Sequence, residues 1–475
     1  MNLSIQNLKH IHLIAICGTG MGSLAGMLKS KGYQVTGSDQ AVYPPMSEQL
    51  AHQGIAVWEG YSPKHLEPKP DLVVIGNAIS QGNPEGDAVL ELGIPYMSMT
   101  EALRTFFFAD RTAIAVCGTH GKTTATALLA WTLELAGKEP TYLVGGVLEN
   151  TGLSFHVGQG PLAVVEGDEY DNAWFDKVPK FIRYRPDIAI INNIEFDHAD
   201  IYPDFEAVLS AFRRLIQELP PTGLLVAGID CPHVRELLDL APCRTITYGL
   251  DRTADFTAVI DDLDLQRMTF TYSKRGRKQK SYKTSLIGRH NLKNLLGVIA
   301  LAGELSLSPQ EIKAGLTSFR GVKRRQQVRG KVDDILVIDD FAHHPTAVAV
   351  TLEALKMAQP RRRLVAVFEP RSNTSRRNIF QQSYALSFGA ADLIVICEVF
   401  LKGGAMPADK LDVAALVEAL NRQGKEAFYA TDYAAVIALL STILKPHDQV
   451  AFLSNGAFGN LPVRALNMLQ EREPT

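Results

Sequence analysis

Residues 118–124, Gly-Thr-His-Gly-Lys-Thr-Thr, have the types and spacing of a loop that binds phosphate. The apolar run at residues 112–116 predicts a buried strand before the loop, and residues 125–135 predict a helix after it. Glycines let backbone N–H groups close around phosphate oxygens, and the helix N-terminus adds partial positive charge. Lys122 is placed to reach the β- and γ-phosphates, and Thr123 to bind Mg²⁺ through its hydroxyl. The stretch predicts a nucleoside triphosphate site; because the loop is shorter than the commonest pattern, a plain strand–turn–helix junction is the alternative.

Two further apolar runs, residues 162–166 and 188–192, end in acidic residues. The first leads into Glu-Gly-Asp-Glu-Tyr-Asp at residues 166–171, and the second into Asn-Ile-Glu-Phe-Asp-His at residues 193–198. Ligands of open α/β sheets collect at the carboxyl ends of strands, where a carboxylate can hold Mg²⁺ and a neutral His198 ring can bind a metal. A solvated acidic turn and a histidine that merely starts a helix are the alternatives.

A glycine-rich segment near the N-terminus, Gly18-Thr19-Gly20-Met21-Gly22, follows an expected strand at residues 12–16 and precedes an expected helix at residues 23–31. Asp39 closes the next strand. Ser23 stands where a dinucleotide-binding motif has its last glycine, which argues against an oxidoreductase that uses NAD. The segment favours diphosphate binding at a helix N-terminus, and a tight turn without a ligand is the alternative.

Polar residues also cluster later in the chain. Asn291 and Asn294 stand three apart at the start of an expected helix, where their amides can contact an adenine edge or Asn291 can simply cap the helix. Asp340 and His343 follow the expected strand at residues 335–339, and Arg371 follows the one at 364–368, where it can contact phosphate or carboxylate.

The chain divides into three blocks of alternating strands and helices, which predicts an α/β fold with parallel sheets. The 475 residues suit two or three domains, and we place the boundaries at 1–107, 108–320 and 321–475. Arg325 lies at the second junction, where residues can swing into a site as domains close. Residues 274–283 carry a basic run that we interpret as a solvated hairpin tip.

Composition excludes several classes of protein. The chain is 46% hydrophobic and 21% charged with a net charge of −3, so nucleic acid and anionic membranes are not expected partners. We expect no signal peptide, because no early apolar run is long enough, and no segment approaches the roughly 20 apolar residues that span a bilayer. Five cysteines without a CxxC pair favour neither a disulfide framework nor a zinc knuckle, so we expect a cytoplasmic protein.

Taken together, the motifs at residues 118–124, 166–171, 193–198, 288–294 and 340–345 resemble the Mur ligase family in order and spacing over essentially the whole chain. The resemblance implies a Rossmann-like N-terminal domain that binds a UDP-sugar, a central P-loop ATPase-type α/β domain that binds ATP, and a Rossmann-like C-terminal domain that binds the incoming peptide. It also implies an ATP- and Mg²⁺-dependent ligase of peptidoglycan metabolism. Such an enzyme joins an amino acid or short peptide to UDP-N-acetylmuramate through an acyl phosphate, and we expect a monomer or weak homo-oligomer.

Within the family, residues 168–177, 180–184 and 367–374 resemble the peptide-recycling branch, whose peptide is L-alanyl-γ-D-glutamyl-meso-diaminopimelate. The alternative is the biosynthetic branch that adds L-alanine. Two departures stand out: Gly167 replaces a usual alanine, and Phe212 falls where other members carry a carbamylated lysine, so we expect no carbamate. The peptide's third residue, its tolerance, the oligomeric state and the number of metal ions stay open.

The resemblance implies roles for individual residues. The catalytic set is Lys122, His198, Glu166, Asp340, His343 and Arg371. The metal ligands are Thr123, Glu166 and His198. The ATP-binding set is Gly118, Thr119, His120, Gly121, Lys122, Thr123, Thr124, His290, Asn291, Asn294 and Arg325. The UDP-sugar-binding set is Gly18, Thr19, Gly20, Met21, Gly22, Asp39, Asn77, Ala78 and Ile79. A nucleotide-binding protein that kept the fold and lost turnover is the alternative from another class.

Overall fold

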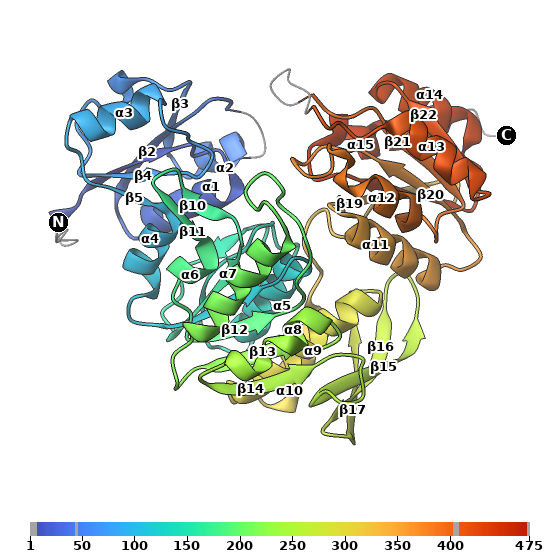
Figure 1. Cartoon of the computed structure of the whole chain (residues 1–475), viewed down its shortest axis with the longest axis horizontal. Helices are drawn as coiled ribbons and strands as arrows, with labels where there is room; N and C mark the ends of the chain where they lie inside the picture. The colour runs from blue at the N-terminus through green and yellow to red at the C-terminus, as the bar shows by residue number, and fades with distance from the viewer. Residues whose placement is uncertain (1–6, 43–45, 402–407, 473–475) are drawn as a thin grey trace. The chain divides into compact units, whose positions relative to one another are not determined.

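The computed structural model of the chain describes residues 7–42, 46–401 and 408–472, and Figure 1 colours them by residue number. The chain forms two compact units. The first comprises Met1–Glu195, Glu206–Thr257 and Leu295–Phe319, and the second comprises Phe196–Phe205, Ala258–Asn294 and Arg320–Thr475. The predicted α/β class is confirmed, and the boundaries at 107/108 and 320/321 stay a prediction. Across the described ranges, no helix is long and apolar enough to cross a membrane.

The first unit contains an N-terminal parallel sheet with strand order β3-β2-β1-β4-β5. Its strands are β1 (His10–Ile14), β2 (Gln34–Asp39), β3 (Ala56–Glu59), β4 (Leu72–Ile75) and β5 (Tyr96–Ser98). Its helices are α1 (Thr19–Ser30), α2 (Met46–His52), η2 (Pro63–Leu66), α3 (Pro84–Glu91), α4 (Met99–Leu103) and the π-helix η3 (Arg104–Phe108). Every residue of β1 and β4 is buried, as expected for the central strands of a parallel sheet.

The first strand and helix differ from the sequence prediction. The strand expected at residues 12–16 ends at Ile14, because Ala15 has a positive φ of 66° that no strand accepts. Of the glycines expected to form a turn, Gly18 is the N-cap of α1, whereas Gly20 and Gly22 lie inside the helix. A Cβ at Gly22 would stand 2.1 Å from the Met46 Cε, so this glycine is needed for close packing and not for turn formation.

The first unit also contains a central sheet with strand order β14-β13-β12-β6-β9-β7-β8, parallel except for the β7–β8 pair. Its strands are β6 (Thr112–Cys117), β7 (Thr141–Leu143), β8 (Phe155–His156), β9 (Leu162–Gly167), β12 (Ile188–Ile191), β13 (Leu224–Gly228) and β14 (Arg244–Tyr248). A hairpin, β10 (Asp171–Ala173) and β11 (Asp176–Pro179), follows β9. The helices are α5 (Lys122–Leu135), α6 (Lys180–Arg183), α8 (Pro232–Glu236), η4 (Leu238–Leu240) and α10 (Pro309–Ser318).

Three elements begin in one unit and end in the other: α7 (Phe205–Gln217), β15 (Phe256–Leu263) and α9 (Arg289–Glu304). In the second unit, β16 (Met268–Lys274) and β17 (Arg277–Thr284) form an antiparallel hairpin. The basic run at residues 274–283 was expected to be a hairpin tip. Only its start forms the turn, and the rest is the exposed strand β17, whose charged side chains protect a sheet edge.

The C-terminal sheet of the second unit has strand order β18-β19-β23-β20-β21-β22, parallel except for β18. Its strands are β18 (Gln327–Val332), β19 (Ile335–Asp340), β20 (Arg363–Phe368), β21 (Leu393–Cys397), β22 (Glu426–Ala430) and β23 (Asp448–Leu453). Its helices are α11 (Pro345–Ala358), η5 (Asn378–Phe380), α12 (Gln381–Ser387), α13 (Val413–Arg422), α14 (Tyr433–Ile443), η6 (Phe458–Asn460) and α15 (Leu461–Gln470).

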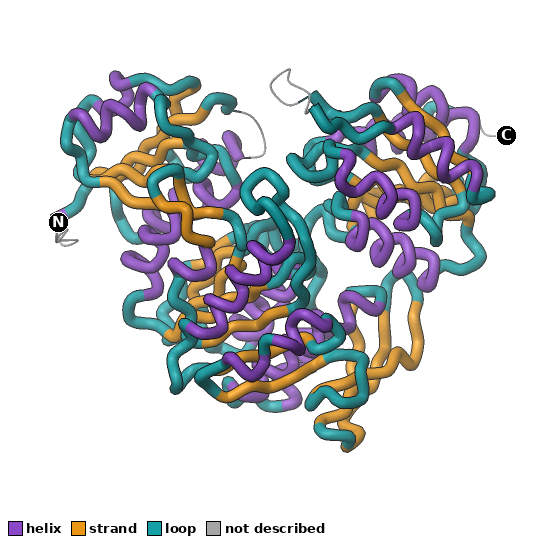
Figure 2. Tube along the Cα trace, viewed as in Figure 1, coloured by secondary structure: helices purple, strands orange, loops and turns teal. Residues whose placement is uncertain are grey.

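Alternate residues of the buried strands supply two separate cores in this sheet. Ala366 and Phe368 of β20 pack into the core that includes residues of α11 and α13, whereas Val365 and Val367 pack into the core that includes residues of α14 and α15. Side chains along a strand point to opposite faces, so a continuous apolar run fills both cores. Figure 2 shows helices on both sides of the sheet.

A polar network lies inside the N-terminal sheet. The Glu85 carboxylate, fully buried on α3, accepts hydrogen bonds from the Ser38 hydroxyl (2.9 Å) and the Ser62 N–H (3.0 Å) and is bonded to the rings of His12 (2.7 Å) and His65 (3.1 Å). Burial alone would raise the pKa of Glu85, but these partners, His12 first, lower it below its ordinary value of 4.5. The network fixes α3 against the sheet.

We predict that Glu85→Ala lowers the free energy of unfolding by about 3–5 kcal/mol, because it removes the shared partner of buried polar groups. The folded pKa lies below the unfolded one, so the wild-type advantage is complete above pH 4.5 and is lost as the pH falls through the folded pKa. Urea denaturation between pH 3 and 7 measures both effects. Glu91→Ala, an exposed position on the same helix, is the control; an equal, pH-independent loss in both variants would contradict the prediction.

Candidate active site

The predicted phosphate loop lies between β6 and α5, as the sequence indicated. Gly121 is the N-cap of α5 with a φ of 83°, and Gly118 has a φ of 120°. A Cβ at Gly118 would stand 2.8 Å from the backbone oxygen of Asn193, so only glycine fits this position. The first N–H groups of α5 therefore lie at the loop, where a helix N-terminus is suited to an anion.

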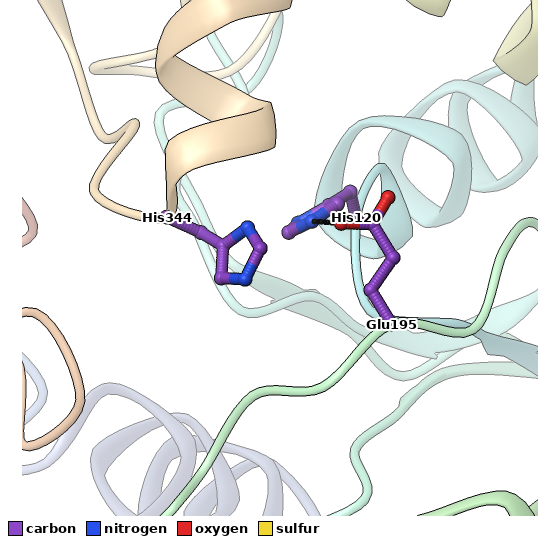
Figure 3. Close-up of side chains that lie close together, drawn as sticks. All are labelled: His120, Glu195 and His344. Carbon is purple, nitrogen blue, oxygen red and sulfur yellow. Dashed lines mark hydrogen bonds and ion pairs between the residues drawn. The ribbon is translucent and has the colours of Figure 1, made fainter. Parts of the chain in front are cut away.

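Residues that follow β12 hold the loop in place. The Asn193 backbone oxygen accepts the Thr119 N–H (3.0 Å), and its side-chain oxygen accepts the His120 N–H (2.8 Å). The Asn192 amide donates to the His120 backbone oxygen (3.1 Å), and the Glu195 N–H donates to the Thr119 hydroxyl (2.8 Å). The His120 Nε2 lies 3.4 Å from a Glu195 carboxylate oxygen (Figure 3). The loop conformation is thus specified by the end of β12 as well as by its own glycines.

Lys122 is surrounded by carboxylates. Its Nζ lies 2.8 Å from the Glu169 Oε2 and donates to the Thr119 backbone oxygen at 3.3 Å. The Lys122 side chain is 11% exposed and that of Glu169 2%, so this ion pair is largely shielded from water. Burial alone would lower the pKa of Lys122, but the carboxylate of Glu169, with two further carboxylates of the same segment, raises it well above its ordinary value of 10.5. Lys122 therefore carries a fixed positive charge.

Glu166, at the end of β9, connects the loop to a second glycine. Its Oε1 accepts a hydrogen bond from the Thr123 hydroxyl (3.0 Å), and its Oε2 accepts the Gly145 N–H (2.9 Å). A Cβ at Gly145 would stand 2.4 Å from that oxygen, so the close approach requires glycine. The Thr123 hydroxyl and the Glu166 carboxylate form an adjacent pair of oxygen donors, the type of donor that Mg²⁺ prefers.

The structure explains why residue 167 is glycine. A Cβ at Gly167 would stand 2.3 Å from the Sγ of Cys117, which is the last residue of β6. The thiol fills the space that an alanine side chain would need.

The predicted motif at residues 193–198 is divided between the two units after Glu195. In the second unit, the Arg377 guanidinium donates to the Ala199 backbone oxygen (3.0 Å) and the Asn373 amide to Asp200 (2.7 Å).

Asp197 is buried; burial alone would raise its pKa, but three nearby histidines, His198 first, lower it well below its ordinary value. His198 has a left-handed φ of 57°, and its N–H donates to the Asp197 carboxylate (2.7 Å). Glu166 belongs to the other unit, so a metal site shared by Glu166 and His198 stays a prediction.

The residues predicted to contact adenosine lie on α9 and the following junction. Asn291 and Asn294 are both buried and joined by a 3.2 Å hydrogen bond, which confirms that they share a helix face. The Asn291 amide also donates to the Ile287 backbone oxygen and to Gln326, and α9 begins before it at Arg289, so the capping alternative is wrong. His290 occupies the same first turn, and the Arg325 guanidinium lies 4.6 Å from the centre of the Phe341 ring.

The three residues predicted in the C-terminal segment lie at or just beyond the carboxyl ends of β19 and β20. Asp340 is buried and accepts hydrogen bonds from the N–H groups of Gln326 and Ala342, each at 2.7 Å. Burial raises the pKa of Asp340 above its ordinary value, although Arg325 and these two hydrogen bonds act to lower it. The His343 Nδ1 lies 3.0 Å from the Phe341 backbone oxygen, and burial lowers the pKa of this ring.

Arg371 is held from two sides. Its guanidinium lies 3.6 Å from the centre of the Phe400 ring and 3.6 Å from a Glu369 oxygen. It crosses Gly456 so closely that a Cβ there would stand 1.9 Å from the Arg371 Nε.

The predicted UDP-sugar set surrounds the N-terminus of α1 and the end of β4. Asp39 accepts the Cys17 N–H at 2.7 Å, so its carboxylate also fixes the turn before α1. Asn77 and Ala78 are exposed, whereas Met21 and Ile79 are buried. Gly18 and Thr19 are exposed at the helix start, where α1 presents N–H groups.

Comparison with known proteins decides the family. Three family models match in succession: "Mur ligase family, catalytic domain" over residues 10–110, "Mur ligase middle domain" over 116–302, and "Mur ligase, glutamate ligase domain" over 324–456. The chain belongs to the Mur ligase family.

The similarity to individual Mur ligases extends over nearly the whole chain. UDP-N-acetylmuramate–L-alanyl-γ-D-glutamyl-meso-2,6-diaminoheptandioate ligases of Escherichia coli and Haemophilus influenzae are 39% and 37% identical and cover 97% and 98% of this chain, and 98% and 100% of their own. UDP-N-acetylmuramate–L-alanine ligase of Rubrobacter xylanophilus is 36% identical and covers 94% of this chain and 97% of its own.

Two solved structures of Mur ligases match as well. A murein peptide ligase from Psychrobacter arcticus has a TM-score of 0.72 at 35% identity, with 98% of this chain and 100% of that chain covered. A UDP-N-acetylmuramate–alanine ligase from Thermotoga maritima has a TM-score of 0.80 at 25% identity, with the same coverage.

Several residues of this Mur ligase escaped the sequence prediction. Glu169, the partner of Lys122, was one of several carboxylates in its motif, and nothing local distinguished it. From the sequence, Asn192 and Asn193 only marked the end of a strand. Two consecutive amide side chains at a strand end could have indicated residues that hydrogen-bond the neighbouring phosphate loop. Phe212, by contrast, was singled out from the sequence; it is fully buried against Phe181 (5.1 Å between ring centres) and offers no polar group.

We predict that Lys122→Ala abolishes ATP turnover and also destabilises the protein by about 3–5 kcal/mol, because Glu169 stays buried without its cation. Lys122→Ala/Glu169→Gln should regain most of that stability, because a neutral amide replaces the carboxylate, and remain inactive. Phosphate release and chemical denaturation of both variants measure this. Turnover by the double variant would contradict the role of Lys122, and an unaltered stability of the single variant would contradict the importance of the pair.

Proposed function

We propose that this Mur ligase joins UDP-N-acetylmuramate to the tripeptide L-alanyl-γ-D-glutamyl-meso-diaminopimelate at the expense of ATP. The observation that carries the proposal is the 37–39% identity, over 97–98% of the chain, to ligases named for that reaction. The fixed charge of Lys122 beside a glycine-rich helix N-terminus supports the use of a triphosphate.

We assign the phosphate loop and the carboxyl end of β9 to ATP. The backbone of residues 118–124 binds the phosphates, and Lys122 exchanges Glu169 for the β- and γ-phosphate oxygens. The adjacent oxygens of Thr123 and Glu166 fit Mg²⁺. We keep His198 as a further metal ligand on the ground of the family resemblance. When bound, Mg²⁺ supplies positive charge that offsets the charge developing on the transferred phosphoryl group.

The reaction in this proposal has two chemical steps. A muramate carboxylate oxygen attacks the γ-phosphorus, the bond to the β-phosphate oxygen breaks, and ADP leaves; the product is an acyl phosphate. The amine of the peptide then attacks the acyl carbon, loses a proton, and expels inorganic phosphate to leave an amide. Lys122 stabilises the negative charge that develops in the first step, and burial of the Lys122–Glu169 region excludes water from the reactive acyl phosphate.

Substrates divide over the predicted domains in this proposal. Residues 1–107 bind the UDP-sugar through the start of α1, Asp39 and the backbone near Asn77. Residues 108–320 bind ATP, with the Asn291–Asn294 pair and His290 toward adenosine, and Arg325 joins them from just beyond the second domain boundary. Residues 321–475 bind the peptide, where the held guanidinium of Arg371 suits a carboxylate and Asp340 and His343 complete the site. We place the enzyme in the cytoplasm, where ATP and UDP-sugars occur, as a monomer or weak homo-oligomer.

A second candidate is the ligation of L-alanine to the same UDP-sugar. It is favoured by the TM-score of 0.80 to an alanine ligase and by the 36% identity to another. Both reactions use the same carboxylate chemistry, so they differ only in the amine that the C-terminal segment accepts.

We predict ATP- and Mg²⁺-dependent phosphate release with UDP-N-acetylmuramate and the tripeptide, and at least tenfold less with free L-alanine, because the peptide offers further carboxylates for recognition. A coupled phosphate assay with mass detection of the product measures it, and reactions lacking UDP-N-acetylmuramate are the control. The reverse preference would establish the alanine ligase, and no release with either amine would leave a nucleotide-binding protein without turnover.

A further inference from the structure

We propose that the hairpin β10–β11 couples UDP-sugar binding at the N-terminal sheet to nucleotide binding at the phosphate loop, with Asn172 as its positioning residue. The proposal rests on the substrates assigned under the proposed function. The contacts that carry it lie in the first unit alone, which contains both the region assigned to the UDP-sugar and the phosphate loop.

Asn172 joins the hairpin to the N-cap of α4. Its side chain is 1% exposed; the amide donates to the Ser98 hydroxyl (2.7 Å), and the amide oxygen accepts from the Thr100 hydroxyl. Ser98 is the N-cap of α4, where its hydroxyl accepts the Glu101 N–H (3.3 Å) and its own N–H donates to the Glu101 carboxylate (2.8 Å). Breaking these bonds would leave buried donors and acceptors without hydrogen bonds, which costs free energy. Movement of the hairpin must therefore move the start of α4 with it.

Asp176 makes the Asn172 contact rigid. It accepts the second N–H of the Asn172 amide (2.8 Å) and a bidentate pair of bonds from Arg183 of α6, both at 2.7 Å. A bidentate guanidinium–carboxylate pair fixes orientation as well as distance. Asn172 therefore has one orientation, with its oxygen on Thr100 and both N–H groups in use.

Two aromatic side chains at the hairpin turn pack against the N-terminal sheet. Trp174 and Phe175 contact the apolar cluster that includes Ile75, Ile79 and Val89, and Phe175 meets the Tyr96 ring edge-on at 5.1 Å. Ile79 lies in the loop after β4 that we assign to the UDP-sugar. The hairpin turn thus packs against the same apolar cluster as Ile79 of that loop.

The other end of the hairpin begins at the phosphate loop. Glu169, the partner of Lys122, precedes Asn172 by three residues. The start of α6, directly after the returning strand, fixes the same turn, because Lys180 pairs with Asp168 at 2.8 Å and its N–H donates to the Tyr170 backbone oxygen (2.9 Å). When phosphate replaces Glu169 at Lys122, the released carboxylate must shift, and the shift passes directly into β10.

The consequence is a free-energy coupling between two ligands. A UDP-sugar that fixes the loop after β4 also fixes the hairpin and hence the position of Glu169, so nucleotide binding then needs less rearrangement. Such couplings are reciprocal and typically about 5- to 150-fold in affinity. The residues do not touch either ligand, so their effect should fall on the coupling and not on each affinity alone.

The test is calorimetric titration of the full-length protein with Mg²⁺ and the β,γ-methylene analogue of ATP, with and without saturating UDP-N-acetylmuramate. In the wild type, we expect the UDP-sugar to tighten analogue binding at least about fivefold, the lower end of such couplings. Asn172→Ala and Thr100→Ala should each bring this ratio to within twofold of one, while the Kd of each ligand alone changes less than threefold.

Three variants control the test. Thr100→Ser keeps the hydroxyl and should retain the wild-type ratio. The double variant Asn172→Ala/Thr100→Ala should lose no more than Asn172→Ala alone, because that single variant already breaks the bond to Thr100. Lys177→Ala removes a 70% exposed side chain that pairs with Asp171 on the same hairpin and should leave the ratio unaltered. Melting temperatures identify a variant that fails to fold; if Asn172→Ala does, Thr100→Ala tests the contact from its other side.

A wild-type ratio of one, or an unaltered ratio in folded Asn172→Ala and Thr100→Ala, would overturn the coupling and leave the ligase assignment intact. Failure of the wild type to bind either ligand would instead contradict the proposed function.

Discussion

One buried ammonium group holds the centre of the first unit together. The Lys122 Nζ faces three carboxylates that end β9, those of Glu166, Asp168 and Glu169, and pairs directly with the last. Without the cation these carboxylates would repel one another in a region shielded from water. The loop after β6 and the end of β9 therefore specify each other. A triphosphate brings still more negative charge to the same place, which is why the proposed reaction needs Mg²⁺ beside Thr123 and Glu166.

The supports of this centre reach outward through short polar contacts. Asn192 and Asn193, just after β12, hydrogen-bond the phosphate loop. Asn172, just after the acidic segment, donates a hydrogen bond to Ser98, the N-cap of α4. The segment after Glu195 is different, because it is held by Arg377 and Asn373 of the second unit. A motif that is continuous in sequence thus supplies its two ends to different compact units.

Local sequence predicted what local physics determines. The place of the loop between β6 and α5 follows from an apolar run, glycines and a helical pattern, and strands such as β21 are continuous apolar runs, so these elements were predicted correctly. The start of the chain was harder, because the positive φ of Ala15 and the packing role of Gly22 depend on neighbours distant in sequence. The Glu85–His12 bond joins residues 73 apart, and only the fold selects Glu169 among its neighbouring carboxylates as the partner of Lys122.

The central claim is that ATP activates the muramate carboxylate as an acyl phosphate. UDP-N-acetylmuramate with ¹⁸O in both carboxylate oxygens tests it most directly, by mass spectrometry of the phosphate and the amide formed during ligation. The account predicts one ¹⁸O in each inorganic phosphate and one in the new amide carbonyl, because the attacking oxygen leaves with phosphorus when the amine displaces it. Unlabelled phosphate, or formation of AMP and pyrophosphate in place of ADP, would contradict the account.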